Sequence, residues 1–422
     1  MRTPADGVVL IYHHQAPYAA TVMEHVHSFA AYSSLPVWEI NVDFGFPPAL
    51  RSLEPRVIVL HYSLFGAEHY QLPEAFREWL RAADGSYRIA FFQDEHQYVR
   101  QRFAFIDDHG IDCVYSLVDP EYHAAVYGAH TRVPRIIYTL TGYVSDELVR
   151  LAAAKALPDA QRRIDIGYRS RSLPWYQGRG AQEKSRIGVE FLERTAGSDL
   201  VVDIAMDEDS RLYGEAWTDF LANSRAFIGV EAGVSIFDLT GEVKAEFDTL
   251  VADHPEMSFE EMEARLLARH EGNIPYRTVS PRHFEAAAFR VVQILFEGRY
   301  SGVLEPMRHY IPLKKDFSNF DEVMALFRDP EVRRRLTDNA YADLIESGRY
   351  SYRSFIRSFD EDLAAVGILP GDRSQDAVIG RMLRRGTLVG RAKAIGRPYY
   401  RRALPHSVRV SARAALDRLR QR

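Results

Sequence analysis

Short apolar runs alternate with amphipathic stretches along most of the chain, and this alternation limits the possible folds more than any other feature. In the first 150 residues six runs are typical of β-strands: Val8–Tyr12, Val37–Val42, Val57–Tyr62, Arg88–Phe92, Cys113–Ser116 and Arg135–Tyr138. The stretches between them favour helices, among them Thr21–Tyr32, Pro73–Ala83 and Glu121–Tyr127. Strands that alternate with helices predict a parallel sheet that is covered on both faces.

The alternation begins again near residue 165, which predicts a second sheet. Its strands are expected at Ile164–Tyr168, Leu200–Ala205, Ala226–Val230, Val291–Phe296 and Tyr310–Ile311, with helices at Gln182–Thr195, Tyr213–Asn223 and Phe320–Phe327. A chain of 422 residues is also too long for one ordinary core. We therefore predict an α/β fold with two Rossmann-like doubly wound domains facing a cleft, at residues 1–155 and 156–366. A basic helical C-terminal tail, residues 367–422, follows them.

The charge of the chain is divided unevenly. Residues 371–422 contain 14 Arg or Lys and three Asp, a net charge of +11, so residues 1–370 carry −16 of the overall −5. Apolar residues are interleaved with the arginines, as in segments that lie on an anionic membrane surface. A solvated or disordered tail is the alternative. Nucleic-acid binding favours basic charge on a folded face with aromatic residues, so we expect no nucleic-acid partner.

Several classes of protein are disfavoured by what the sequence lacks. The single cysteine, Cys113, excludes an internal disulfide, and no clustered Cys/His pattern suggests a metal site. No GxGxxG turn follows the first strand and no GxxxxGK[ST] loop occurs, which argues against nicotinamide and P-loop chemistry. No apolar run approaches the roughly 20 residues of a membrane span, and no signal-peptide pattern is seen. We expect a cytoplasmic protein, peripheral on the inner membrane face, with neither metal nor cofactor.

The stretch SPRHFEAAAF, residues 280–289, carries one carboxylate in a nearly apolar run. Ser280 suits a helix N-cap and Pro281 the first helical position, so Glu285 is expected in the first turns of a helix. The helix dipole alone stabilises a carboxylate there, which is the structural explanation. A strand and then a loop with Gly298 and Gly302 follow, and this order suggests a nucleotide site instead.

In such a site each residue type binds one part of the nucleotide. A carboxylate accepts both hydroxyls of a ribose, which we assign to Glu285. Arginines at a strand end and backbone N–H groups of a glycine loop suit a pyrophosphate. The predicted donor-binding residues are therefore Arg169, Arg171, Glu231, Ser280, Arg282, Glu285, Tyr300, Ser301 and Gly302.

Four segments carry a family resemblance: SPRHFEAAA, EGRYSGVL, HYIPLKKDFSNFDEV and FRDPEVRRRLTDNAYADLIESGRYSYRSFI. They resemble the C-terminal part of GT-B fold glycosyltransferases of the group 1 and spore-maturation-like type. The resemblance is close over some 80 residues, Ser280 to about Phe359, and IDIGYRSRSLPWYQGRGAQEK resembles an earlier part of the same domain. In the retaining members of that class the glutamate that opens EAxA binds the donor ribose, and Glu285 matches it.

The sequence also departs from that class. Arg277 stands where those enzymes often carry a second glutamate, and the Phe289–Arg290 pair replaces the usual glycine before the next strand. An acidic, helix-rich insertion lies between Glu231 and Ser280.

The resemblance implies transfer of a sugar from a nucleotide-sugar donor to a glycan or lipid-linked acceptor. The first domain would be the acceptor side, with polar residues crowded at the end of an apolar strand: Asp94, Glu95 and His96, our catalytic candidates. A loop of structural polar residues is the alternative. A nucleotide-sugar epimerase of the same fold and an inactive sugar-nucleotide-binding protein also remain open.

Overall fold

The structure is a computed structural model that describes residues 3–14, 20–66, 70–371 and 373–385. Most of the predicted basic tail, residues 386–422, lies outside the described residues. The first six strands are β1 (Thr3–Tyr12), β2 (Val37–Asn41), β3 (Leu53–Leu60), β4 (Tyr87–Phe91), β5 (Cys113–Ser116) and β6 (Arg135–Tyr138). Their order in the sheet is β2-β1-β3-β4-β5-β6. Residues 8–11 and 57–60 are completely buried, as expected for parallel strands covered on both faces.

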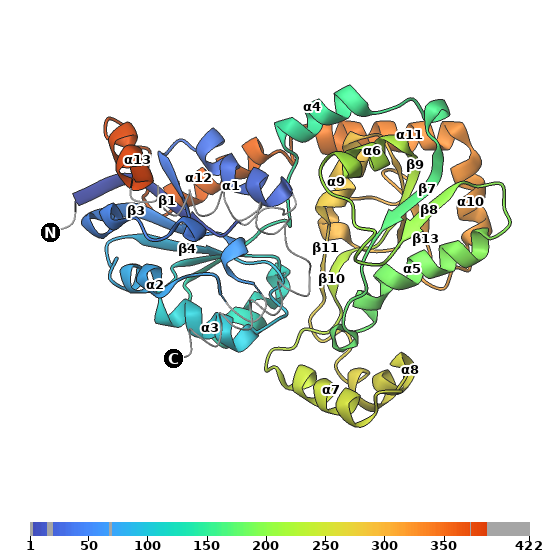
Figure 1. Cartoon of the computed structure of the whole chain (residues 1–422), viewed down its shortest axis with the longest axis horizontal. Helices are drawn as coiled ribbons and strands as arrows, with labels where there is room; N and C mark the ends of the chain where they lie inside the picture. Colours follow the sequence, from blue (N-terminus) through green and yellow to red (C-terminus); the bar gives the residue numbers. More distant parts are fainter. Residues whose placement is uncertain (1–2, 15–19, 67–69, 372, 386–422) are drawn as a thin grey trace, which may run out of the picture. The chain divides into compact units, whose positions relative to one another are not determined.

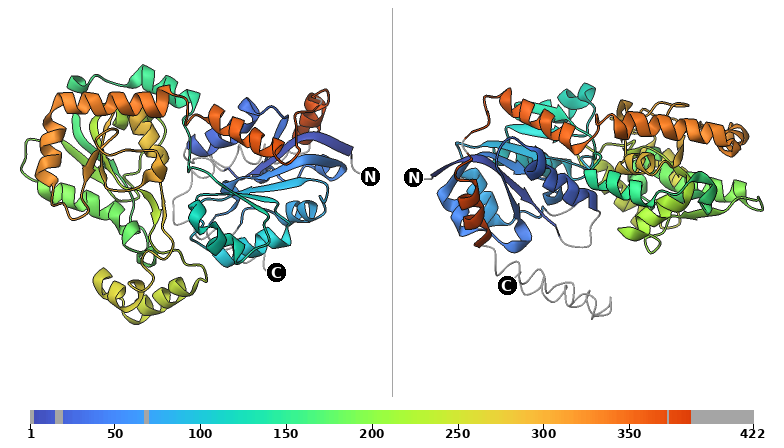
Figure 2. Two further views of the ribbon diagram at one scale, coloured as in Figure 1. Left: turned by 180° about the vertical axis from the view of Figure 1, so that it is seen from behind. Right: turned by 90° about the horizontal axis from the view of Figure 1, so that it is seen from above.

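The second sheet consists of β7 (Ile164–Arg169), β8 (Val202–Ala205), β9 (Ser224–Gly229), β12 (Val292–Phe296) and β13 (Ile311–Leu313). Its order is β13-β12-β9-β7-β8, and every pair is parallel. Helices α5 (Arg179–Thr195) and α10 (Phe320–Arg328) lie against one face, and α6 (Glu215–Asn223) and α9 (Pro281–Ala288) against the other (Figures 1 and 2). Two Rossmann-like parallel sheets confirm the predicted α/β fold class.

The remaining α-helices flank these sheets along the chain: α1 (Ala20–Tyr32), α2 (Glu74–Arg81), α3 (Val99–Asp108), α4 (Asp146–Lys155), α11 (Pro330–Tyr341), α12 (Tyr352–Ala364) and α13 (Asp376–Arg385). The predicted helix at Glu121–Tyr127 is present but is not a regular α-helix. Residues 120–128 are helical throughout, with a 3₁₀ helix at Pro120–Tyr122 and a π-helix at Ala124–Gly128.

The described residues fall into two compact units. The smaller is drawn from Met1–Tyr18, Ser34–Arg88 and Leu369–Arg422, and the larger from Ala19–Ser33 and Ile89–Ile368. The predicted domain boundaries, 1–155, 156–366 and 367–422, stay a prediction. No helix among the described ranges is both long and apolar enough to cross a membrane.

The predicted insertion between Glu231 and Ser280 is present and folds around a small core that it shares with Tyr176. Strand β10 (Ala232–Val234) pairs antiparallel with β11 (Tyr276–Thr278), and α7 (Glu242–Asp253) and α8 (Phe259–Met262) lie between them in sequence. The core includes Ile236, Met262 and Leu267. This additional core explains how the insertion, residues 232–279, enters the second domain without breaking its sheet.

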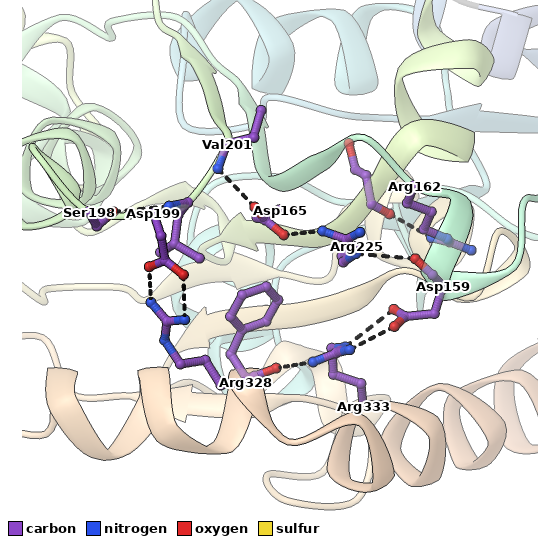
Figure 3. Close-up of polar contacts among 12 residues, drawn as sticks. Asp159, Arg162, Asp165, Ser198, Asp199, Val201, Arg225, Arg328 and Arg333 are labelled. Atoms are coloured by element: carbon purple, nitrogen blue, oxygen red, sulfur yellow. Dashed lines mark hydrogen bonds and ion pairs between the residues drawn. The ribbon is translucent and has the colours of Figure 1, made fainter.

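Ion pairs tie together the ends of the second sheet at which its strands begin (Figure 3). Asp165 on β7 pairs with Arg225 on β9 and accepts a 2.8 Å hydrogen bond from the Val201 N–H. Arg333 on α11 pairs with Asp159 at 2.6 Å, and Arg328 at the end of α10 pairs with Asp199. Ligands of doubly wound sheets bind at the opposite, carboxyl edge. We therefore interpret this network as structural.

Candidate active site

The helix that carries Glu285 begins where the sequence predicts. The Ser280 side chain accepts a hydrogen bond from the Arg282 N–H, and Nδ1 of His283 accepts one of 3.0 Å from the Ser280 N–H. His283 is fully enclosed, and burial lowers its pKa to about 3, so the ring is neutral and able to accept this bond. The predicted helix start at Ser280 and Pro281 is confirmed.

Glu285 is only partly buried and is oriented by an indole. Trp217 on α6 donates a 2.8 Å hydrogen bond from Nε1 to Oε2 of Glu285. The guanidinium of Arg282 lies 5.3 Å from the centre of the Trp217 ring. Burial raises the pKa of Glu285, while the Trp217 bond and the Arg282 charge oppose that shift. Trp217 was not identified from the sequence, because nothing local pairs it with a residue 68 positions away.

Next to Ser280 and Arg282 a cavity of about 240 Å³ opens at the carboxyl ends of β7 and β9. Four basic side chains line it: Arg171 after β7, Lys184 on α5, Arg211 after β8, and Arg282 on α9. No carboxylate is among its described lining residues. The Arg211 guanidinium also pairs with Glu208 at 2.5 Å. Converging cations at the carboxyl edge of a parallel sheet suit a diphosphate.

The sequence analysis missed two basic residues of this cavity, Arg211 and Lys184. Lys184 lies on α5. Burial is the main cause that lowers the pKa of its ammonium to about 8. The charges of Arg277, Arg282 and Arg171 add to the shift, and that of Asp94 opposes it. A partly desolvated cation among other cations is stabilised by a bound anion.

Of the two predicted strand-end arginines, the structure directs only one to the cavity. Arg169 forms a 2.7 Å ion pair with Asp203 and lies 4.4 Å from the centre of the Phe220 ring. Arg171 is exposed and lines the cavity. The main-chain oxygen of Arg169 accepts a hydrogen bond from Arg282, so it helps to orient that residue. A role of Arg169 in donor binding stays a prediction.

The backbone nest predicted after β12 is occupied by a side chain of the protein itself. Oε1 of Glu231 accepts hydrogen bonds from the N–H groups of Arg299, at 3.1 Å, and Tyr300, at 2.7 Å. Gly298 makes room, since a Cβ there would lie 2.7 Å from the Glu231 carboxyl carbon. These N–H groups therefore bind Glu231 in the structure, which corrects the expectation that they point toward a pyrophosphate.

The loop after β12 is also tied to the start of α9. Tyr300, Ser301 and Gly302 all have positive φ, and the Ser301 hydroxyl accepts a 3.1 Å bond from the Val279 N–H. The Tyr300 hydroxyl donates to the carbonyl of Phe296 at 2.7 Å. These contacts hold the loop against the residue before Ser280; direct donor binding by Tyr300, Ser301 and Gly302 stays a prediction.

Arg277 organises the carboxylates behind the cavity. Its guanidinium pairs with Glu183 on α5, donates to the Gly180 carbonyl at 2.6 Å, and lies 3.5 Å from Oε2 of Glu231. Lys315 adds a 2.7 Å pair to the other oxygen of Glu183. Glu183 and Glu231 are both buried, so their charges require these partners. An arginine at this position thus neutralises two acids, one on α5 and one after the end of β9.

The three acceptor-side candidates after β4 have different surroundings. Glu95 is buried and accepts hydrogen bonds from the Ser116 hydroxyl at 2.6 Å, the Leu117 N–H at 2.7 Å and the hydroxyls of Tyr127 and Tyr276. Burial raises its pKa. Because its carboxylate already accepts these hydrogen bonds, Glu95 has the environment of a structural residue. Its catalytic role stays a prediction.

Asp94 and His96 are better placed than Glu95 to contact an acceptor. Asp94 is exposed and has a φ of 50°, a strained conformation of the kind found at functional sites. Its charge acts on both Lys184 and His96, so it lies on the side of the cationic cavity. His96 is buried with a pKa lowered to about 4 mainly by burial, and its Nδ1 has no hydrogen-bond partner among the described residues.

No group of three or more His, Cys, Asp or Glu side chains that would hold a metal ion occurs within the described part of the chain.

Comparisons with known proteins yield similarity to solved structures only. No family model matches the chain, and no curated protein matches it. An alpha-glucosyltransferase in complex with UDP and a DNA 13-mer is 10% identical, with 86% of this chain and 100% of that chain covered and a TM-score of 0.49. Anabaena HepE in complex with UDP and glucose is 11% identical over 86% and 100%, with a TM-score of 0.47. TarM is 12% identical over 73% and 54%, with a TM-score of 0.38. All three overlaps fall below a TM-score of 0.5, so the function proposed next rests on the residues of this chain.

Proposed function

We propose that the protein is a glycosyltransferase that moves a sugar from a nucleotide-sugar donor to a glycan or lipid-linked acceptor at the cytoplasmic face of a membrane. The observation that carries this proposal is the cavity lined by Arg171, Lys184, Arg211 and Arg282. Arg282 also packs on the Trp217 ring, which holds the carboxylate of Glu285. A nucleoside diphosphate offers the matching groups, because its phosphates are anionic and its ribose hydroxyls are hydrogen-bond donors.

The reaction requires these residues to hold the donor and to stabilise the leaving group. The bond between the sugar's anomeric carbon and the diphosphate oxygen breaks, and negative charge grows on that oxygen. Lys184, Arg171 and Arg282 stabilise this charge, because they are already gathered where it develops. Glu285, held by Trp217, accepts hydrogen bonds from the ribose hydroxyls and so fixes the position of the donor.

The acceptor hydroxyl forms the new bond to the anomeric carbon and loses its proton. We assign that proton to Asp94, an exposed carboxylate whose charge acts on Lys184. Nε2 of His96 accepts a hydrogen bond from the Gln97 amide, so the proton of the neutral ring is on Nδ1; this N–H, free of described partners, donates to the acceptor oxygen and orients the hydroxyl. The basic residues supply the counter-charge, so the reaction proposed here uses no metal ion.

The membrane location is supported by the charge of the C-terminal segment. Residues 386–422 contain ten Arg or Lys and one Asp. Anionic lipids attract such segments by about 1 kcal/mol per basic residue near the surface. An enzyme held at a membrane in this way would act on a lipid-linked acceptor, or on a glycan growing on one.

The test is a panel of UDP-, GDP- and dTDP-sugars, with binding measured by calorimetry and slow donor hydrolysis by nucleotide release. We expect one donor to bind and to be hydrolysed, with no effect of EDTA. Glu285→Ala should weaken binding by about 10- to 100-fold, the worth of hydrogen bonds to a charged group. Glu346→Ala, which removes an exposed carboxylate from the same domain, is the control and should bind as the wild type does.

Three outcomes would contradict the proposal. If no donor binds, Glu285 is only a helix-end residue. An epimerised nucleotide sugar without nucleotide release would identify an epimerase. Binding with no turnover, even with candidate acceptors added, would identify a sugar-nucleotide-binding protein.

A further inference from the structure

Helix α13, the last described element, has apolar side chains on two faces, one buried and one exposed. Ile379 and Leu383 are 3% and 5% exposed, and the helix packs through them against β2 and the short 3₁₀ helix Pro48–Ser52. Val378 and Met382 are 48% and 41% exposed. Residues four apart on a helix lie side by side, so Val378 and Met382 form one continuous outer strip. The inner face already holds α13 in the fold, and the outer strip is available for another contact.

The anchoring of α13 is specific. Trp38 on β2 donates a 3.0 Å hydrogen bond from Nε1 to Oδ1 of Asp376, the first residue of the helix. Trp38 is itself 5% exposed. A helix fixed in this way presents its outer strip in a constant orientation, which a helix formed only on binding would not.

The outer strip is surrounded by positive charge. Arg381 is exposed next to Met382, and Arg384, one turn after Arg381, is also exposed. The chain then continues into residues 386–422, with ten Arg or Lys and one Asp. Exposed apolar residues flanked by basic ones are the composition of helices that lie in the interface of anionic membranes.

We propose that the outer strip of α13, Val378 and Met382 with Arg381, inserts into the surface of an anionic lipid bilayer. This inference deepens the membrane location in the proposed function and rests on it. The area favours a bilayer over a protein partner, because two side chains are far from the roughly 1,200 Å² that a stable protein interface buries. A bilayer needs only shallow apolar insertion together with basic charge.

The test is flotation of the full chain with vesicles of phosphatidylcholine alone or with about 30% phosphatidylglycerol. The variant Val378→Asp/Met382→Asp is compared with Val189→Asp/Leu192→Asp on α5, whose side chains are similarly exposed at 43% and 41%. Both variants lose two apolar groups and gain two negative charges, so net charge is matched. Val378→Ser/Met382→Ser removes the apolar groups without adding charge, and thermal unfolding checks that all variants fold.

We expect the wild type to float with the anionic vesicles only. The α13 Asp variant should bind them at least about tenfold more weakly than the α5 variant, and the Ser variant several-fold more weakly than the wild type. Equal binding of the α13 and α5 variants would overturn the inference, since charge in the tail would then suffice. So would failure of the wild type to bind anionic vesicles. Donor hydrolysis is measured on the same samples, so failure of the glycosyltransferase proposal would be seen separately.

Discussion

At the scale of single residues, Lys184 gives the cavity a pH dependence. Its pKa of about 8 means that the ammonium is charged below pH 8 and loses its charge as the pH rises through that value. Donor affinity should therefore be constant up to about pH 7.5 and fall about tenfold by pH 9, as the charged fraction of Lys184 falls. Calorimetry with the donor identified from the panel measures this directly.

Lys184→Arg is the matched control for this prediction, since arginine stays charged throughout that pH range. The variant should bind the donor with an affinity that changes little between pH 7 and pH 9. If it loses affinity as steeply as the wild type, a group other than Lys184 titrates. Lys314→Ala, an exposed lysine after β13, should leave both affinity and pH dependence unchanged.

At the scale of elements, the loop after β12 depends on the contact between Gly298 and Glu231. The φ of Gly298 is not in the left-handed region, so alanine fits the backbone there, yet its Cβ would lie 2.7 Å from Oε2 of Glu231. Gly298→Ala should push the carboxylate off the N–H groups of Arg299 and Tyr300. We expect a loss of about 1–3 kcal/mol, seen as a lower thermal midpoint.

A double-mutant cycle shows whether that loss comes from the carboxylate. In a Glu231→Ala background no carboxylate meets the new Cβ, so Gly298→Ala should cost much less than it does in the wild type. Equal costs in the two backgrounds would mean that Gly298 is required for another reason, and that Glu231 does not organise the loop.

At the scale of the whole molecule, the second sheet has a structural network where its strands begin and the proposed donor site where they end. Arg162, in the network drawn in Figure 3, donates to the carbonyls of Leu157 at 2.9 Å, Ser224 at 2.6 Å and Phe289 at 2.7 Å. Burial lowers the pKa of Arg162 to about 10, so it stays charged at neutral pH. Arg162 thus joins three segments of the chain at the ends of the strands away from the cavity.

Arg162→Met should leave those carbonyls without their donor and destabilise the protein by about 2–4 kcal/mol, measured by thermal or urea unfolding. Donor affinity well below the unfolding transition should be unchanged, because the substitution is at the opposite edge from Lys184 and Glu285. Arg334→Met, which breaks an exposed i,i+3 pair with Glu331, should cost less than about 0.5 kcal/mol. A large loss of donor affinity in Arg162→Met would contradict this separation.

The sequence by itself determined the features that depend on neighbours along the chain. The alternation of strands and helices predicted the α/β class, and Ser280 with Pro281 predicted the start of α9, because side-chain periodicity and capping are local properties. The same local reasoning placed Glu285 within a helix beside a strand. It also predicted that Glu121–Tyr127 is helical, but not that the segment winds as a 3₁₀ helix and then a π-helix.

Only the tertiary structure decided which partner each polar group takes. Glu231 accepts hydrogen bonds from N–H groups 68 and 69 residues away. The Arg169 side chain pairs with Asp203. Lys184 lines a cavity together with arginines from three other segments. No local pattern encodes these choices, because hydrogen bonds and ion pairs depend on distances that exist only after the chain has packed. The sequence therefore named the residue types of an anion site, and packing decided which of them surround it.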